Sequence, residues 1–428
     1  MRVLVLGGYG LIGSAVVSNL LRSGDKVICL TRSVRGNRAD VEWRRGDLAR
    51  MTSPEDWLPL LDDVDAIVNC AGALQDSPRD DLRKVHVDGP LALFRACAQR
   101  GIRRIVHVSA AGLENGQTAF ARTKREAETT LCALDLDWFI LRPGLVLAPA
   151  AYGGTALLRG LAGFPLVTPV AEANAIVQTV GIEEIVATVS LCLHGNPKPR
   201  AIWELASPEK VTIGEIVKGY RAWLGLPPRS VLSLPRPLVR VAAVFADLAG
   251  LLGWRSPMRS TAVSQLAAGV SAAPESWMQA TAIAPRSFAA TLSDLAASVQ
   301  ERWFARLYFV KPLAILGLSA FWIVSGLISA FPARESAIDL AQRSGLAPAI
   351  SLLAVAGGAA LDILLGLMLL VASTARFALL SMIALSFLYL GAGIVLAPTL
   401  LLDPLGPLVK IVPAVLAALF LLAIMDDR

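Results

Sequence analysis

The chain has 428 residues and a mean hydropathy of +0.58, with 55% apolar and only 17% charged residues, a composition that is unusual for a purely soluble protein. The length is enough for two or three domains, and the apolar excess is concentrated near the end, because only nine charged residues lie between Lys311 and Met425. The net charge of +6 arises entirely before Lys311. It either keeps the protein soluble, or attracts the protein to anionic lipid, or attracts a phosphorylated cofactor. We find no basic helix or aromatic-basic platform and therefore expect no nucleic-acid partner.

Five cysteines are scattered singly among apolar residues, and no two have the spacing of a metal or redox pair. We interpret them as buried, small hydrophobic side chains in a reducing compartment, and expect no metal site and no disulfide framework. The N-terminus enters a strand without the charged, apolar and cleavage segments of a signal peptide, so we expect none before the fold.

A glycine-spaced turn near the N-terminus is the strongest motif. Gly7, Gly10 and Gly13 follow the apolar run Val3 to Leu6 and precede residues that are apolar at helical spacing. In this context the first glycine permits the tight turn, the second lets the backbone approach a pyrophosphate, and the third lets helix and strand pack closely. The helix N-terminus then faces the phosphates, which predicts a dinucleotide site.

The residue after the second predicted strand, Lys26 to Thr31, indicates which dinucleotide is bound. An acidic residue there accepts hydrogen bonds from the ribose hydroxyls of NAD, whereas a basic residue pairs with the additional phosphate of NADP. Arg32 stands at this position, with Arg35 and Arg38 nearby, so we expect NADP(H) to be favoured over NAD(H). The alternative is that these arginines are solvated on a surface loop.

Strands and helices continue to alternate along the first half of the chain. Alternation at this spacing predicts right-handed crossovers and a parallel, doubly wound sheet covered on both faces, which is an α/β Rossmann fold. The further predicted strands are 41–45, 65–70, 104–109 and 138–141, and the helices between them are 80–99, interrupted near 89–90, and 118–133.

The motifs at the strand ends resemble those of short-chain dehydrogenases/reductases, over about residues 1 to 300. They are GGYGLIG, GDL, NCAG, VSA, FARTK and LRPG, and within the superfamily they are most similar to the atypical branch, with the NmrA-like regulators and the dinucleotide-binding accessory subunit of respiratory complex I. The resemblance implies that the dinucleotide is lined by Gly7, Tyr9, Gly10, Leu11, Ile12, Gly13, Arg32, Asp47, Leu48, Ala71, Gly72, Lys124 and Pro143.

The chain departs from the family at the residue that matters most for chemistry. Active members have a tyrosine four residues before the lysine, and its phenol exchanges a proton with the substrate. Here the pair is Phe120 and Lys124, and phenylalanine has no exchangeable proton. The resemblance still implies that Lys124 binds the nicotinamide ribose and that Ser109 binds a carbonyl oxygen.

Without the tyrosine, the proton for the substrate would come from water or from a nearby side chain. The candidate side chains are His86, His107 and Tyr152, although a structural role fits each of them better.

Residues 150–180 and 205–300 are expected to form cap elements on the substrate side. A helix is predicted to start near 180–185, a strand at 201–205 and a helix at 212–224. The stretch 231–270 is rich in leucine, valine and alanine, with four arginines. It is either a soluble helical cap with an apolar inner face or a mouth that dips toward the bilayer and admits a lipophilic substrate.

The last third of the chain predicts an all-α, four-helix transmembrane bundle. Four apolar stretches, 312–331, 346–372, 377–397 and 408–425, are each long enough to cross a hydrocarbon core of ~30 Å. Basic and aromatic residues at 301–311 are typical of an interfacial linker on the positive side, which predicts a multi-pass protein of the cytoplasmic membrane with its nucleotide domain in the cytoplasm.

Two motifs in this part, ALDILLGLML and DPLGPLVKIVP, resemble the DoxX-like membrane family over residues 312–428. The resemblance implies membrane residence and quinone-linked redox chemistry, but it assigns no catalytic residue. Asp362 lies inside an apolar span, where an ionisable group is costly unless it is paired or hydrated. It is therefore either a functional site or a carboxylate hydrogen-bonded between helices.

These features lead to one main functional hypothesis and two alternatives. We expect a membrane-anchored oxidoreductase that passes hydride from NADP(H) to a small lipophilic acceptor such as a quinone or an isoprenoid carbonyl, with membrane lipids as neighbours and no protein partner identified. With Phe120 in place of tyrosine, the chain could instead hold NAD(P)H as a non-catalytic regulatory or assembly protein. A transporter with an appended domain is the weakest alternative, because one charge lies deep in the spans.

Overall fold

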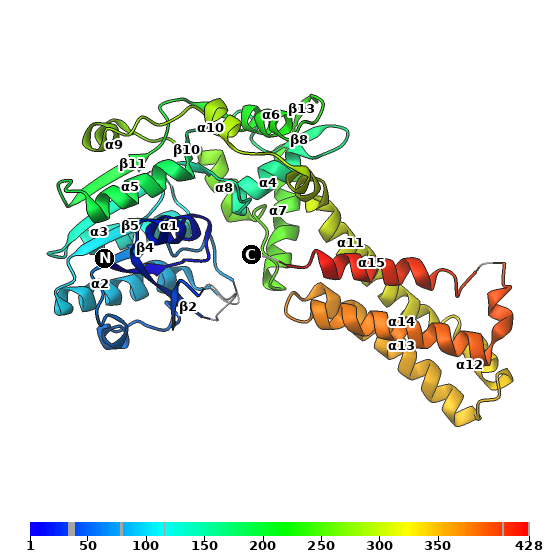
Figure 1. Ribbon diagram of the computed structural model, residues 1–428. Helices are drawn as coiled ribbons and strands as arrows, with labels where there is room; N and C mark the ends of the chain where they lie inside the picture. Colours follow the sequence, from blue (N-terminus) through cyan, green and yellow to red (C-terminus); the bar gives the residue numbers. More distant parts are fainter. Residues whose placement is uncertain (33–38, 78–79, 115, 405, 427–428) are drawn as a thin grey trace. The chain divides into compact units, whose positions relative to one another are not determined.

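The computed structural model describes residues 1–32, 39–77, 80–114, 116–404 and 406–426, and its contacts divide the chain into two compact units (Figure 1). The first unit comprises Met1–Leu248 and Ser256–Ala305, and the second comprises Ala249–Arg255 and Arg306–Arg428. The stretch expected as an interfacial linker, 301–311, lies inside one continuous helix, α11 (Val299–Ala330).

The first unit is built on a seven-stranded sheet with the order β11-β6-β5-β4-β1-β2-β3, in which every pair of neighbours is parallel. The strands are β1 (Arg2–Leu6), β2 (Lys26–Thr31), β3 (Glu42–Arg45), β4 (Ala66–Asn69), β5 (Arg104–Val108), β6 (Asp137–Pro143) and β11 (Ala201–Leu205). The predicted Rossmann-type sheet is thus confirmed. The strand order reverses between β1 and β4, and a ligand crevice forms at the carboxyl ends of the strands at such a point.

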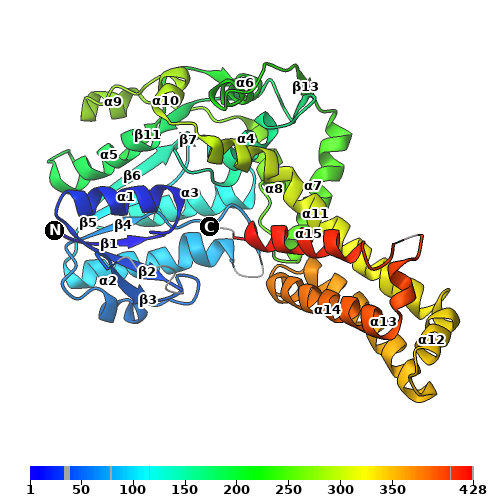
Figure 2. The same ribbon diagram turned by 45° about the vertical axis from the view of Figure 1, so that its right-hand side comes forward.

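Helices cover both faces of this sheet (Figure 2). On one face, α1 (Leu11–Arg22) and α5 (Ile182–His194) share a buried core with Val3 and Val5 of β1. On the other face, Leu4 and Leu6 belong to a core that includes α2 (Gly89–Arg100) and α3 (Ala119–Cys132). Because alternate side chains of β1 enter opposite cores, the strand is apolar throughout.

The segments expected to form a cap contain short helices and three two-stranded sheets. The helices are α4 (Gly153–Ala162), α6 (Ile213–Trp223), α7 (Arg236–Leu251), α8 (Ser260–Ala268), α9 (Glu275–Thr281) and α10 (Phe288–Asp294), and the paired strands are β7 (Leu145–Leu147) with β10 (Thr179–Gly181), β8 (Thr168–Val170) with β13 (Val231–Ser233), and β9 (Ile176–Val177) with β12 (Val211–Thr212). The predicted helix after Thr212 is present, and Thr212 caps it by accepting a hydrogen bond from the Glu215 amide at 3.2 Å.

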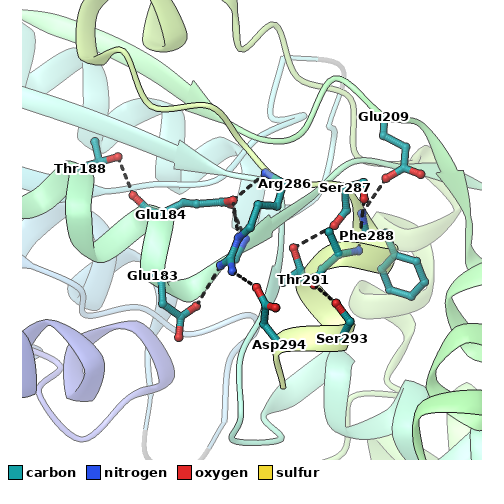
Figure 3. Close-up of polar contacts among 12 residues, drawn as sticks. Glu183, Glu184, Thr188, Glu209, Arg286, Ser287, Phe288, Thr291, Ser293 and Asp294 are labelled. Atoms are coloured by element: carbon teal, nitrogen blue, oxygen red, sulfur yellow. Dashed lines mark hydrogen bonds and ion pairs between the residues drawn. The ribbon is translucent and has the colours of Figure 1, made fainter. Parts of the chain in front are cut away.

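An ion-pair cluster fixes the segment before α10 to helix α5. Figure 3 shows Arg286 beside Glu184 of α5 and Asp294 of α10, with which it forms ion pairs. Glu184 also accepts hydrogen bonds from the backbone amides of Arg286 and Gly181, each at 2.7 Å, so one carboxylate caps α5 and holds the returning chain. Every group of this cluster has a partner inside the fold, and we assign it a structural role.

The second unit contains the four expected apolar helices, which share one buried core. They are α11, α13 (Pro348–Leu370), α14 (Ala375–Leu396) and α15 (Ile411–Ala423), and a charged helix that the sequence analysis did not anticipate, α12 (Arg334–Arg343), follows the first of them. Three of these helices, α11, α13 and α14, are long and apolar enough to cross a membrane.

The fourth expected span is a correction. The stretch 408–425 forms a helix of only 13 residues, which covers about 20 Å at 1.5 Å per residue and is therefore shorter than the ~30 Å hydrocarbon core. Turns occupy residues 407–410, so the apolar residues at the start of this stretch are not part of the helix. A short 3-10 helix, Pro398–Leu401, lies further upstream. The hydropathy of this stretch located its apolar residues correctly but did not predict how few of them are helical.

Asp362 has a hydrogen-bonding partner on the neighbouring helix. Its carboxylate is buried and accepts a hydrogen bond of 2.9 Å from the Tyr389 hydroxyl of α14. This is the arrangement of a polar contact between helices, the second of the two alternatives weighed for Asp362.

Candidate dinucleotide site

The turn after β1 adopts the conformation that its glycines predict. Gly7 has φ +73°, in the left-handed region, and its carbonyl accepts a hydrogen bond from the Gly10 amide at 2.8 Å. A Cβ added at Gly7 would lie 2.8 Å from the Cys70 carbonyl oxygen, so a side chain here would strike the loop that follows β4. The turn therefore lies against the carboxyl end of the neighbouring strand, in the crevice.

Gly13 allows α1 to pack directly on that turn. A Cβ at Gly13 would lie 2.1 Å from the Gly7 carbonyl oxygen, which no alternative rotamer could relieve because both groups are backbone. At the start of the same helix, Gly10 supplies no side-chain cap and the first turn holds no acidic residue. The helix therefore presents its N-terminal amides and the positive end of its dipole without a competing carboxylate, as a pyrophosphate requires.

The loop after β4 brings the glycine turn and Lys124 to the same place. A Cβ added at Gly72 would lie 3.5 Å from the Lys124 ammonium nitrogen and 3.6 Å from Nε2 of His86. Asn69 shapes this loop, since its Oδ1 accepts a hydrogen bond from the Ala71 amide at 3.1 Å. Residues from the first and second halves of the sheet, which the family resemblance placed together, thus meet at Gly72.

Lys124 is buried and is held by the end of β5. Its ammonium donates a 3.0 Å hydrogen bond to the Val108 carbonyl. Burial lowers the pKa of Lys124 to about 8, against the opposing effect of the Glu128 carboxylate. The adjacent Ser109 is also buried, and its hydroxyl has no hydrogen-bond partner among the described residues. A buried ammonium and an unpaired hydroxyl beside a dinucleotide crevice are groups that can act on a substrate oxygen.

Phe120 occupies the tyrosine position one helical turn before Lys124, and its half-buried ring meets the edge of the His86 imidazole at 5.6 Å between centroids. His86 lies in a π-helical turn (Lys84–Asp88), where Nε2 accepts a hydrogen bond from the Ala73 amide. The other ring nitrogen therefore carries the proton and donates it to the Thr123 hydroxyl at 2.8 Å. Burial and the Lys124 charge lower the pKa of His86 to about 3, so it stays neutral at pH 7.

The other two proton-donor candidates fit catalysis no better. His107 is buried in β5, where Nδ1 lies 3.1 Å from the Asn69 amide nitrogen, and burial holds the pKa of His107 well below its ordinary value. Tyr152 is 41% exposed at the start of α4. His86 and His107 thus both help to position the end of β4 and the loop that follows it, through Ala73 and Asn69 respectively. His86 could be picked out from the sequence but its partner Thr123 could not, because the contact joins residues that are 37 positions apart in the chain.

At the opposite end of the crevice, Arg32 lies directly after β2 and pairs with Asp80 at 2.9 Å. The Arg32 side chain is 45% exposed, and an ion pair this accessible contributes about 0–1 kcal/mol. Arg35 and Arg38 lie outside the described residues. Asp47 accepts a hydrogen bond from the Ala49 amide at 3.1 Å and so shapes the turn after β3.

The remaining expected residues support the site's walls. Tyr9 stacks on Trp43 of β3, with ring centroids 4.5 Å apart, and sequence reasoning had missed Trp43. Leu48 is buried, and Leu11 and Ile12 pack against the core at the start of α1. Pro143 ends β6, and its carbonyl accepts a hydrogen bond from the Ala111 amide, which positions the loop after Ser109.

Comparison with known protein families agrees with this division of the chain. Residues 3–134 match the NAD dependent epimerase/dehydratase family, which is related to the short-chain dehydrogenases, and residues 319–419 match the DoxX-like family. The chain thus joins a Rossmann-type domain that is similar to the epimerase/dehydratase family to a domain that is similar to the DoxX-like family. It is a membrane protein on the evidence of that second match and of three membrane-length helices.

The individual relatives are proteins of diverse kinds. The photosystem II assembly factor Ycf39 of Synechocystis sp. is 31% identical over 144 residues, which cover 33% of this chain and 44% of that protein. Sterol demethylase protein B of Methylococcus capsulatus is 26% identical, covering 58% of this chain and 81% of that protein. Ceramide reductase of Caulobacter vibrioides is 25% identical, covering 57% and 77%. The chain spans less than half the length of the first relative.

Solved structures support the fold. The enzyme WbmG of Bordetella bronchiseptica, in complex with NAD and UDP, superposes with a TM-score of 0.54 at 16% identity, over 72% of this chain and 96% of that one. At this identity the likeness establishes the Rossmann-type architecture only.

Proposed function

We propose that this protein is a membrane-bound oxidoreductase that uses NADP(H) to reduce a lipophilic acceptor such as a quinone or an isoprenoid carbonyl. The observation that carries the proposal is the buried Lys124 ammonium, which lies beside Gly72 and donates a hydrogen bond to the carbonyl of Val108, the residue directly before Ser109 with its unpaired, buried hydroxyl. A domain that only stored a dinucleotide would use Lys124 to bind the ribose but would gain nothing from a buried Ser109 hydroxyl without a partner, because burying an unpaired polar group is costly.

In this proposal, the bound dinucleotide supplies the hydride to the acceptor carbon. Ser109 donates a hydrogen bond to the acceptor oxygen, and Lys124 supplies the proton that this oxygen takes up as it becomes a hydroxyl. Lys124 then recovers a proton from solvent. A group with a pKa of about 8 suits this role, since it is protonated at pH 7 and releases its proton readily.

The DoxX-like domain and the names of two relatives support a lipophilic acceptor. Sterol demethylase protein B and ceramide reductase both carry the name of a lipid, and this chain joins its Rossmann domain to a DoxX-like domain. The basic and aromatic residues before Lys311 favour a cytoplasmic nucleotide domain at the inner membrane, where NADPH is available.

The alternative is a non-catalytic NAD(P)H-binding protein that regulates or assembles a membrane complex. Two observations favour it: Phe120 occupies the place of the tyrosine, and one relative is named an assembly factor.

One experiment distinguishes the two functions. Short-chain quinones and apolar ketones are added to the purified, detergent-solubilised full chain with NADPH, and the nicotinamide absorbance is followed. Oxidation that depends on the acceptor supports the enzyme, whereas tight NADPH binding without oxidation across the panel supports the alternative and refutes the enzyme.

The variant Arg32→Glu should shift the cofactor preference from NADP toward NAD. Losing one charge-assisted contact to a phosphate costs about 1.5–3 kcal/mol, which lowers the NADP/NAD affinity ratio by about 10- to 100-fold. The ratio is measured by titrating NADPH and NADH against nicotinamide fluorescence. Arg95→Glu, an exposed position on α2, is the control and should leave the ratio unchanged. An unchanged ratio in Arg32→Glu would refute the assignment.

The variant Phe120→Tyr should increase the rate of carbonyl reduction. It places a phenol one helical turn from the Lys124 ammonium, which lowers the pKa of the phenol, and a positioned general acid contributes about 10²-fold or more. The measurement is kcat with an apolar ketone. Phe120→Leu, which removes the ring without adding a hydroxyl, is the control. If the tyrosine and leucine variants are equally slow, the rest of the catalytic arrangement is not intact.

A further inference from the structure

Helix α7 exposes an apolar stripe. Its members are 50% or more exposed and recur every three or four residues, so they lie on one side of the helix; they are Leu238, Val241, Val244, Phe245, Leu248 and Leu251. A soluble protein rarely leaves so many large apolar side chains together in water.

The opposite side of α7 is apolar as well. Val239 and Ala243 are buried, and Val239 and Ala242 line a cavity of about 60 Å³ inside the cap. The other lining residues come from α4, β8, α6, α8 and the loops beside them and are almost all aliphatic, among them Leu161, Val170 and Leu266. A helix that is apolar on both sides is expected where both of its neighbours are apolar.

The chain at the end of α7 belongs to the membrane unit. Residues 249–255 pack within that unit, where the Trp254 indole donates a 2.6 Å hydrogen bond to the carbonyl of Leu370, the last residue of the membrane-length helix α13. The Ala372 amide donates to the Leu252 carbonyl at 3.0 Å. A tryptophan at the end of a membrane-spanning helix is typical of the boundary between hydrocarbon and water, and Leu251, the last residue of the apolar stripe, stands three residues before Trp254 in the chain.

Arginines flank the stripe. Arg240 is an exposed residue on α7, and Arg255 is an exposed residue in the segment that follows it. Exposed guanidinium groups beside an apolar helical face are characteristic of helices that lie in the interface of an anionic bilayer. A contact with a second copy of the chain would not require this charge, nor the continuity with the membrane unit.

From these observations we infer that α7 is an interfacial helix whose apolar stripe lies in the lipid bilayer, with the side chains of Leu238, Phe245 and Leu248 in the acyl region. Resting on the proposed function, the inference adds the source of the substrate: a membrane lipid whose apolar chain enters the cap from the bilayer alongside α7. The substrate class is then a lipid that is dissolved in the membrane rather than one that arrives through water.

The test uses the full chain reconstituted in vesicles of phosphatidylcholine and phosphatidylglycerol. On a Cys132→Ser background, which removes the exposed thiol, Phe245→Cys is labelled with a small fluorophore, and Arg95→Cys on α2 is the matched control. We expect lipids with a nitroxide on the acyl chain to remove about half of the fluorescence at position 245 and none at position 95. Aqueous iodide should do the reverse.

Two results would overturn the inference. Quenching of position 245 by iodide but not by the nitroxide lipid would place α7 in water. Protection from both quenchers, together with a dimer in crosslinking, would make α7 a contact between two copies.

A kinetic arm tests the substrate route. Leu248→Glu should raise KM several-fold for an acceptor dissolved in the bilayer and leave KM for a short, water-soluble acceptor and the Kd for NADPH unchanged. An equal effect on both acceptors would refute the route. The quenching result does not depend on turnover, so a protein that oxidises no NADPH would refute the proposed function and leave the position of α7 to be decided by fluorescence alone.

Discussion

Replacing Lys124 by methionine should lower kcat for NADPH oxidation by about 10²- to 10⁴-fold, the usual contribution of a positioned acid or base. Methionine keeps the length and burial of the side chain but has no ammonium to protonate the acceptor oxygen. The measurement is acceptor-dependent NADPH oxidation at saturating acceptor and saturating NADPH, with circular dichroism and thermal unfolding followed in parallel to show that the variant is folded. A methionine variant that is folded and turns over at the wild-type rate would remove Lys124 from the chemistry.

The pH dependence of the same reaction distinguishes a proton donor from a structural lysine. Because the pKa of Lys124 is lowered to about 8, the ammonium is the major form at pH 7 and the neutral amine is the major form at pH 9. If the ammonium is the active form, kcat is constant below pH 7 and falls as the pH rises through about 8. A guanidinium stays charged throughout this range, so Lys124→Arg, where it retains activity, should lose the fall. A wild-type profile that is flat from pH 6 to pH 9.5 would contradict the proposed proton transfer.

Much of the fold was readable from local patterns. The glycine turn, the apolar runs and the spacing of the strand-end motifs predicted the parallel sheet, because each strand of such a sheet is buried on both faces and leaves a continuous apolar segment. The same rule failed for α15, since the prolines and turns around residues 398–410 shorten a helix without lowering the hydropathy. Hydropathy thus located the bundle but overestimated its fourth helix.

The candidate site was predictable to the extent that it depends on residue types at fixed spacing. Gly13, Lys124 and the substitution at Phe120 could be read directly from motifs. The pairing of Arg32 with Asp80, which are 48 residues apart, and the stacking of Tyr9 on Trp43 could not, because tertiary contacts leave no periodic signal in a single sequence. The π-helical turn that aims His86 at Ala73 and Thr123 was likewise visible only in three dimensions.

Gly13→Ala should abolish dinucleotide binding at micromolar concentrations. The added methyl group would lie 2.1 Å from the Gly7 carbonyl oxygen, so α1 must move away from the turn and withdraw its N-terminal amides from the phosphates. Two charge-assisted hydrogen bonds of about 1.5 kcal/mol each correspond to at least about 10²-fold in Kd. The measurement is NADPH titration by nicotinamide fluorescence, with thermal unfolding recorded for each variant.

Two companion variants make this result interpretable. At Gly154, in α4, an added Cβ meets nothing within 4 Å, so Gly154→Ala should bind NADPH as the wild type does. At Gly10 an added Cβ would lie 3.1 Å from the Gly7 carbonyl oxygen, a close contact that a small shift can relieve. Gly10→Ala should therefore fold normally, but it should bind NADPH more weakly than the wild type. If Gly13→Ala merely fails to fold, the affinity of Gly10→Ala decides the assignment. Wild-type affinity in Gly10→Ala would mean that the pyrophosphate does not approach this turn, and the glycine spacing would then serve the packing of α1 alone.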